Sequence, residues 1–156
     1  MQEIQRVAEQ LERHKARNFS YLGFNASYLY KNDLDVVNSS YNVTKSELTL
    51  PLNALGKNST YTLYIRDGAM PSKVLNDPAN EDVKGQQWVI LAVANSKVNY
   101  GDACSNCNPL QDNNFSFLMT SLGVKCKTKF SLTVENTLKE SNLKSSKPCG
   151  EKSENW

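Results

Sequence analysis

The sequence contains little of what most enzymes and membrane proteins need. Its single histidine, His14, would have to serve any Ser-His-Asp or Cys-His arrangement from the opening segment, far in the chain from every cysteine. It has no Gly-rich phosphate loop and no G-x-S-x-G nucleophile motif. No hydrophobic run approaches the length of a transmembrane helix. We therefore expect a protein that is not an enzyme and that uses no cofactor.

The excess of charge is small as well. A formal net charge of +2 over 156 residues does not by itself indicate a nucleic-acid or membrane partner. The start of the chain also lacks the basic region, apolar segment and cleavage site of a secretory signal. The cysteines nevertheless form an even set, which is typical of an oxidising compartment. We therefore expect a single domain of an exported protein whose export segment has been removed.

The four cysteines admit three interpretations, and all four lie in the last third of the chain: Cys104, Cys107, Cys126 and Cys149. A zinc ribbon would need a second C-x-x-C after Cys126, where Lys129 stands instead. A redox pair would need the first cysteine of the CSNC segment at a helix N-terminus, and the following NPLQDNN does not favour a helix. We therefore expect no metal site and two structural disulfides, whose pairing the spacing leaves open.

The opening segment, Gln2 to Arg17, has the period of an amphipathic helix. Ile4, Val7 and Leu11 recur on one face, and polar residues cover the remaining arc. Acidic residues lie early and basic residues late, the order that the helix dipole favours. We expect this face to pack on a sheet as the helix core face.

Four segments have strand character. Their ranges are 46–52, 60–67, 87–95 and 114–121, and a further short strand is predicted at 129–134. The 87–95 segment is almost continuously apolar, which predicts a central strand covered on both sides. The predicted fold class is α+β, with an N-terminal amphipathic helix packed on a four-stranded antiparallel sheet and a disulfide-bound C-terminal loop.

The connecting segments are polar. Residues 18–35 hold five aromatic residues without a clear period, and we interpret them as a loop whose rings pack under the helix end. Residues 67–85 form a long turn-rich connection with an exposed tip. Its acidic cluster, Asp77, Asn80, Glu81 and Asp82, lacks the spacing of a calcium loop, and we interpret it as a solvated loop.

Three stretches resemble the type IV pilins, and more closely their minor pilins of the pilin E type. The helix leading into ARNFSYLGF resembles the exposed half of the pilin helix. WVILAVAN, a following cysteine and NFSFLMTSLGVK resemble the closing pattern of the family, and CGEKSENW resembles its C-terminal Cys followed shortly by Trp. The sequence departs from the pattern in having CNPLQDNN between Cys107 and the next strand, and four cysteines where two are usual.

The resemblance implies a structural minor subunit of a type IV pilus, made as a membrane-anchored precursor with a methylated N-terminus. Residues 1–18 would be the exposed half of the helix, 19–45 the helix-to-sheet loop, 46–123 the sheet and 124–156 the Cys-bounded region. Its partners would be other pilins, its location the pilus fibre and the inner membrane facing the periplasm, and its roles twitching, adhesion or DNA uptake. The family's loop favours pairing Cys149 with Cys104 or Cys107, and Cys126 with the other.

Three alternative functions remain at the level of sequence. A lysine-rich C-terminal region predicts contact with DNA or a partner through Lys125, Lys127, Lys129, Lys144 and Lys147, although glutamates interleave with these lysines. A pseudopilin of type II secretion would share the resemblance. A secreted eukaryotic glycoprotein would use N-x-S/T sequons such as those at Asn25, Asn38, Asn42, Asn58 and Asn114.

Overall fold

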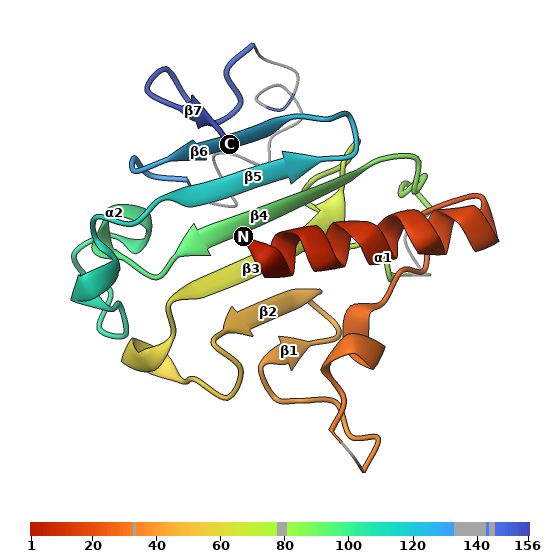
Figure 1. Cartoon of the computed structure of the whole chain (residues 1–156), viewed down its shortest axis with the longest axis horizontal. Helices are drawn as coiled ribbons and strands as arrows, with labels where there is room; N and C mark the ends of the chain where they lie inside the picture. Colours follow the sequence, from red (N-terminus) through yellow and green to blue (C-terminus); the bar gives the residue numbers. More distant parts are fainter. Residues whose placement is uncertain (33, 78–80, 133–142, 144–145) are drawn as a thin grey trace.

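The chain forms one antiparallel sheet with a long helix across one face. The computed structural model describes residues 1–32, 34–77, 81–132, 143 and 146–156. The strands are β1 (Tyr41–Asn42), β2 (Glu47–Leu50), β3 (Tyr61–Asp67), β4 (Trp88–Ala94), β5 (Ser116–Thr120), β6 (Lys125–Thr128) and β7 (Glu154–Asn155). The helices are α1 (Gln2–Asn18), α2 (Lys97–Tyr100) and the 3-10 helices η1 (Ala26–Tyr30), η2 (Gly56–Asn58) and η3 (Pro109–Gln111). The order of the strands in the sheet follows their order in the chain (Figure 1).

The fold class predicted from the sequence is wrong. The sheet has seven strands, not four, and the described chain is mostly sheet with one long helix at its N-terminus. Strands also lie outside the 46–123 range in which the sequence placed the sheet: β1 precedes it, and β6 and β7 follow it. Two residues of β1 and two of β7 are too few to produce an alternating pattern.

The region after β5 contains the largest errors. A strand was expected at 129–134, but residues 129–132 are not in a strand, and residues 133 and 134 lie outside the described part. The strand there is β6, which pairs Lys125 with Met119 and Lys127 with Phe117. Lysines on one side of β6 conceal its strand character, because an exposed strand face needs no apolar residues. The tail was expected to be a loop, yet its end forms β7 beside β6.

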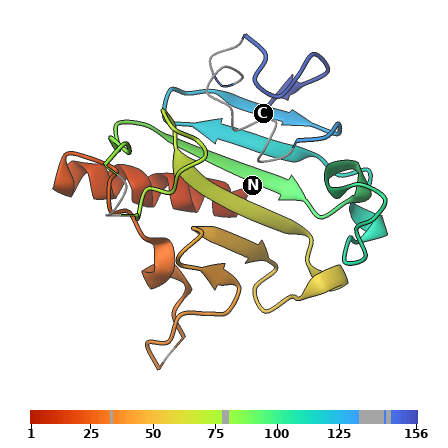
Figure 2. The same cartoon turned by 180° about the vertical axis from the view of Figure 1, so that it is seen from behind.

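β3 and β4 form the centre of the sheet. Their pairing runs from Tyr61 opposite Ala94 to Asp67 opposite Trp88. Every residue of β4 is buried, so the prediction of a strand covered on both sides is confirmed. Figure 2 shows the sheet from behind, with α2 beyond the end of β4.

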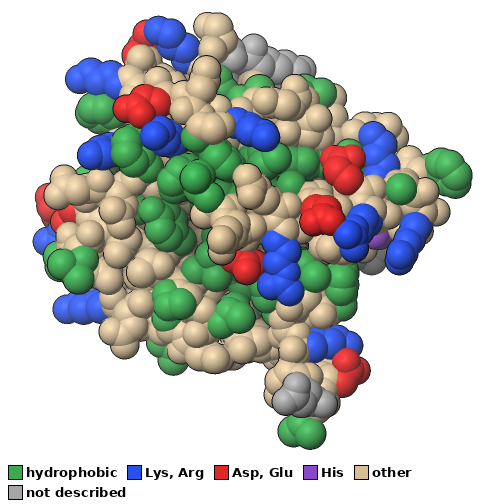
Figure 3. Space-filling view, in the orientation of Figure 1, with side chains coloured by type: hydrophobic (Ala, Val, Ile, Leu, Met, Phe, Trp, Pro, Cys, Tyr) green, Lys and Arg blue, Asp and Glu red, His purple; other side chains and the backbone are tan. Residues whose placement is uncertain are grey.

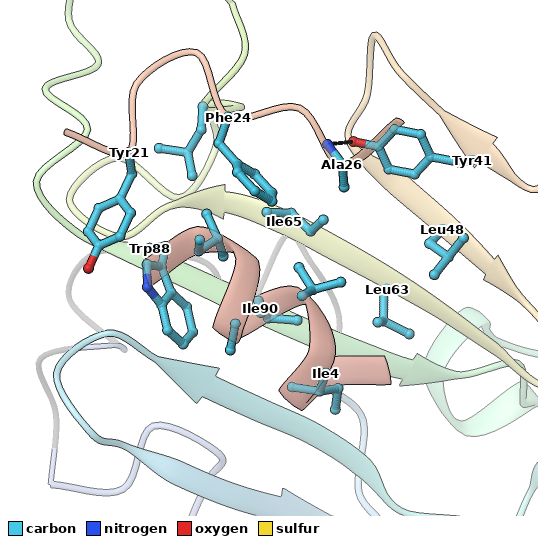
Figure 4. Close-up of a cluster of buried hydrophobic side chains, with 14 of the residues drawn as sticks. Ile4, Tyr21, Phe24, Ala26, Tyr41, Leu48, Leu63, Ile65, Trp88 and Ile90 are labelled. Carbon is cyan, nitrogen blue, oxygen red and sulfur yellow. Dashed lines mark hydrogen bonds between the residues drawn. The ribbon is translucent and has the colours of Figure 1, made fainter. Parts of the chain in front are cut away.

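α1 confirms the predicted helix and ends one residue later than expected. Its predicted core face, Ile4, Val7 and Leu11, is buried together with Ala8. These side chains belong to one cluster with Leu63 and Ile65 of β3 and Trp88, Ile90 and Ala92 of β4 (Figure 4). Fully burying one such aliphatic side chain stabilises the fold by roughly 1.5–3 kcal/mol relative to leaving it exposed.

The aromatic loop after α1 covers the β1–β2 side of the same core. Tyr21, Phe24 and Tyr30 are buried, as the sequence interpretation required, and the Tyr41 hydroxyl accepts a hydrogen bond from the Ala26 amide (3.2 Å; Figure 4). Phe19, however, is 88% exposed. It ends α1 with a left-handed backbone conformation, φ 59°. Phe19 and Tyr28, which is 52% exposed, lie outside the buried cluster that holds Tyr21, Phe24 and Tyr30.

The second face of the sheet holds both the C-terminal disulfide and its own apolar cluster. Cys126 pairs with Cys149, and Cys104 pairs with Cys107, so no cysteine is free. The pairing implied by the family resemblance, Cys149 with Cys104 or Cys107, is therefore wrong. Cys126 and Cys149 are buried with Leu118 and the alternate residues of β4, Val89, Leu91 and Val93. The side chains of Val89, Leu91 and Val93 thus pack in the same cluster as the Cys126–Cys149 disulfide.

The 67–85 connection joins β3 to β4, which are neighbours. Asp67 is fully buried, and its carboxylate accepts hydrogen bonds from the amides of Ala69 (2.8 Å), Met70 (2.7 Å) and Gly85 (3.2 Å). Gly85 has φ +59°, and a Cβ there would lie 2.4 Å from the Leu22 amide nitrogen. Only glycine fits this close approach. Residues 78–80, which include Asn80 and the expected exposed tip, lie outside the described part.

Candidate functional site

Three of the sequence-predicted lysines lie on one face of β6 or directly after it. Lys125, Lys127 and Lys129 alternate with the buried Cys126 and Thr128. Lys127 is paired with Glu154 (3.2 Å), and the ammonium groups of Lys127 and Lys129 lie 4.5 and 5.0 Å from the centre of the Phe115 ring. Within the described residues, Lys125 and Lys129 have no carboxylate partner. The structure therefore brings Lys127 and Lys129 together around one aromatic ring, and Lys125 lies on the same face of β6, opposite Met119.

The two remaining predicted lysines, Lys144 and Lys147, are not among those that the structure places on this face of β6. Lys147 forms an exposed ion pair with Glu151, four residues later. It lines a polar pocket of about 440 Å³ together with Lys125, beside the Cys126–Cys149 disulfide. Lys144 lies outside the described residues. Exposed ion pairs of this kind contribute little to stability, so Lys147 remains available to an external anion.

An aromatic row crosses the α1 side of the sheet. Tyr61 of β3 lies 6.2 Å from Phe117 of β5, and Phe117 meets Trp156 edge to face at 5.7 Å between ring centres. The Tyr61 hydroxyl donates to the Phe115 carbonyl (2.9 Å), and the Trp156 indole donates to the Cys126 carbonyl (2.9 Å). All three rings are half-buried. They remain accessible because α1 covers the sheet over β3 and β4 and leaves β5 to β7 uncovered (Figure 1).

An apolar pocket lies between this row and the first turn of α1. It measures about 180 Å³ and is lined by Met1, Glu3, Ile4, Leu50, Tyr61, Leu63, Ala92 and Phe117. Ala92 opens the pocket, because it is the small residue of β4 between Leu63 of β3 and Phe117 of β5. Figure 3 shows a band of hydrophobic side chains on this face of the molecule. We call this feature the apolar pocket.

The outward arc of α1 is polar and charged. Gln2, Gln5, Arg6, Glu9, Arg13 and Arg17 are exposed. Glu9 pairs with Arg13 and Glu3 with Arg6, so the helix has internal ion pairs along its exposed side. Such pairs are worth only a few tenths of a kcal/mol, which leaves the arc free to vary without loss of the fold.

One carboxylate of α1 joins the helix to the core. Glu12 accepts hydrogen bonds from the Trp88 indole (2.8 Å) and the Tyr21 hydroxyl (2.9 Å). Burial, followed by the hydrogen bond to Glu12, raises the pKa of Tyr21 to about 12. Every polar atom of this group has a partner, so the arrangement is structural in character.

The described residues contain no group of three or more His, Cys, Asp or Glu side chains placed to hold a metal ion. His14 contacts the Leu22 carbonyl (3.0 Å) and packs edge to face on Phe24. Cys104 and Cys107 are joined in a disulfide in a loop that follows α2. In the same part of the chain, no helix combines the length and apolar composition needed to cross a membrane.

The sequon asparagines named above differ in exposure. Asn42, Asn58 and Asn114 are exposed, whereas Asn25 and Asn38 are half-buried. Asn25 caps η1 by accepting a hydrogen bond from the Ser27 amide (2.9 Å), and Asn38 donates to Asn53 (2.8 Å). The Asn38 side chain also accepts a hydrogen bond from the Ser40 amide (2.8 Å), so both Asn25 and Asn38 have a structural role in a turn.

Sequence reasoning missed the aromatic row and the apolar pocket. The alternation of Phe115, Phe117 and Met119 had indicated a strand with one apolar face, but not that this face would lie open. The alternation of Lys125, Lys127 and Lys129 was a second signal. If the lysine-bearing segment is taken as a strand paired with the Phe115–Met119 segment, its lysines lie next to the aromatic residues.

No family model, curated protein or solved structure matches this chain.

Proposed function

We propose that this chain is a structural minor subunit of a type IV pilus, which acts through contacts with other subunits and supports twitching, adhesion or DNA uptake. The supporting observation is the two-sided character of α1. Its apolar stripe packs against the sheet, while a continuous arc of charged and amide side chains faces outward. A filament subunit needs such an arc, because neighbouring subunits must bind a surface that stays soluble before assembly.

The β5–β7 part of the α1 side, which α1 leaves open, adds a second surface for such contacts. It combines half-buried aromatic rings with lysines at its border. Interfaces between proteins are enriched in aromatic residues at their centre and are polar at their rim. The sequence resemblance to pilins and these two surfaces support the same role.

The test is recovery of this chain from filaments of the organism that encodes it. Filaments sheared from cells and purified by sedimentation are expected to contain the chain, and its deletion is expected to reduce piliation or motility. Recovery only in the periplasmic or culture-soluble fraction, with unchanged pili in the deletion strain, would contradict the proposal.

A pair of charge swaps tests the role of the α1 arc. The double variant Glu9→Arg/Arg13→Glu keeps the i,i+4 ion pair and the net charge but inverts their order along the helix. We expect it to fold normally and to enter filaments several-fold less efficiently. The control Lys57→Gln removes an exposed charge in η2, far from α1 in the sequence, and is expected to enter as the unmodified chain does.

A second candidate function, binding of DNA, is favoured by one observation. Lys125 and Lys129 have no acidic partner among the described residues, and Lys129 lies over the Phe115 ring, so cations and a ring share one surface. Phosphate contacts would make binding depend steeply on salt, and each lysine lost would lower the slope of log affinity against log salt by roughly 1. Filter binding with Lys125→Gln/Lys129→Gln against the control Lys57→Gln tests this, and no retention of DNA at low salt removes it.

A further inference from the structure

A short exposed turn between η1 and β1 presents two apolar side chains to solvent. Leu34 is 82% exposed and Val36 is 58% exposed. The segment between η1 and β1 projects away from the sheet in both views (Figures 1 and 2). We call Leu34, Asp35 and Val36 the tip.

The tip is held in place by hydrogen bonds and not by apolar packing. The Asn32 side chain accepts hydrogen bonds from the amides of Leu34 (3.0 Å) and Val36 (3.0 Å). The Asn32 amide donates to the Val36 carbonyl (2.9 Å), and the Asp35 amide donates to the Asn32 carbonyl (2.9 Å). Asx turns of this kind order a loop locally. The two apolar side chains are therefore presented outward by an ordered backbone.

We propose that the tip of one molecule docks into the apolar pocket of a second copy of this chain. The pocket volume of about 180 Å³ accommodates a branched aliphatic side chain, since an apolar cavity of about 150 Å³ holds a benzene-sized group. Its lining by Ile4, Leu50, Leu63 and Phe117 matches a leucine side chain chemically. Removing both surfaces from water is the driving force.

Charges beside the two surfaces are complementary. Asp35 lies between the two apolar residues of the tip; its side chain is 83% exposed and forms an ion pair with Lys31 (2.8 Å). On the sheet, Lys127 is the cross-strand neighbour of the pocket residue Phe117, and Lys125 lies opposite Met119. Lys127 is already paired with Glu154, and the pocket lining includes Glu3, which is paired with Arg6. Lys125 has no acidic partner among the described residues, so it is the cation at this border that is available to Asp35.

This contact must be head to tail. The tip lies beyond β1, at one edge of the sheet, while the pocket lies between α1 and β5 on its face, so each molecule offers both surfaces in different places (Figure 1). Two different patches in contact form a heterologous interface, which extends into open chains unless it closes into a ring. The inference rests on the proposed function for its biological meaning, but it is tested in solution on the chain alone.

The first experiment is sedimentation velocity of the chain over a range of concentrations. The unmodified chain is expected to associate weakly, with a dissociation constant on the order of 0.1–1 mM, because the contact is small. The tip variant Leu34→Ser/Val36→Ser is expected to weaken association roughly tenfold or more. Leu110→Ser is the matched control, since Leu110 is 83% exposed and lies in η3. It should leave association unchanged.

Pocket variants provide the second arm. Phe117→Lys and Leu50→Lys each place an ammonium group at the rim of the apolar pocket, at half-buried positions where the fold is expected to tolerate it. Circular dichroism and thermal melting confirm folding, and a variant that does not fold is replaced by the other. Each folded pocket variant should fail to self-associate to the same extent as the tip variant.

Mixing the tip variant with a pocket variant tests the head-to-tail geometry. A tip variant still has an intact pocket and a pocket variant still has an intact tip, so an equimolar mixture is expected to form a 1:1 dimer and nothing longer. A photo-crosslinking residue at position 34 is expected to label the peptides that contain Tyr61 or Phe117. Association of the unmodified chain without rescue in the mixture, crosslinks elsewhere, or no association up to 1 mM overturns the inference. If the chain does not associate up to 1 mM but is recovered from sheared filaments, the inference fails and the proposed function stands.

Discussion

Glu12 illustrates how one residue of an exposed helix surface can organise buried aromatic groups. Its carboxylate accepts from both the Trp88 indole and the Tyr21 hydroxyl, which come from β4 and the aromatic loop. Neither donor could be buried without loss if this acceptor were absent. Periodicity placed Glu12 on the polar arc of the helix and did not indicate this role.

We therefore expect the Tyr21 hydroxyl to lose its proton only at a pH above the usual range for tyrosine. Its pKa of about 12 lies above its ordinary value of 10.0, so its contribution to stability is complete below pH 10 and is lost as the pH rises from 10 to 12. Glu12→Gln removes the negative charge but keeps an acceptor, and we expect the pKa of Tyr21 to fall while staying above 10 because burial persists. Carbon-13 NMR of the tyrosine Cζ atoms measures this, with Tyr21→Phe to assign the signal. A midpoint near 10 in the unmodified chain would contradict the expectation.

At the level of elements, the two disulfides have different structural roles. Cys126–Cys149 closes a long segment, with a sequence separation of 23, and both sulfurs are part of the buried cluster on the second face. Cys104–Cys107 closes a turn with a sequence separation of 3. A crosslink that closes a longer loop removes more freedom from the unfolded chain.

Removing the long-range disulfide should therefore cost more. By the chain-entropy relation, Cys126→Ser/Cys149→Ser is expected to lower the free energy of unfolding by about 3.5 kcal/mol, against about 2 kcal/mol for Cys104→Ser/Cys107→Ser. Loss of buried sulfur contacts adds to both values, and more to the first, because Cys126 and Cys149 are both buried whereas only Cys107 is buried in the second pair. Urea denaturation of both double variants measures the difference. An equal or greater loss in the Cys104/Cys107 variant would show that the turn disulfide supports more of the fold than its loop length implies.

On the scale of the whole molecule, β4 couples two apolar clusters. Trp88, Ile90 and Ala92 face α1, while Val89, Leu91 and Val93 face the disulfide side. A strand buried on both sides cannot leave one cluster intact when the other opens, because its backbone pairs with β3 and β5 at the same time. The sheet and the apolar clusters on both of its faces should therefore unfold in one transition.

Substitutions on opposite faces test this coupling. Leu11→Ala on α1 and Leu118→Ala on β5 each remove a fully buried side chain, and each is expected to cost roughly 2–5 kcal/mol. Because the two side chains lie in separate clusters, the double variant should show the sum of the two losses within about 0.5 kcal/mol. Tryptophan fluorescence and far-ultraviolet circular dichroism should report one transition in each variant. Separate transitions for the two probes would refute the coupling.

Local periodicity by itself determined α1 and the strands β2, β3, β4 and β5. The helical recurrence of Ile4, Val7 and Leu11 and the apolar run of β4 need no partner to be recognised, since each pattern reflects its own burial. The existence of two disulfides also followed from the even number of cysteines. These features depend on residues close together in the chain.

Only the tertiary structure decided the rest. β1, β6 and β7 are strands because a neighbour in the sheet supplies their hydrogen-bond partners, and two to four residues cannot signal that pairing. Disulfide pairing follows from which segments the sheet brings together, and it differs from the pairing that the family resemblance implied. The apolar pocket, the aromatic row and the lysines around Phe115 arise from the register between strands. The candidate surfaces are therefore products of long-range pairing, whose partners the local sequence does not specify.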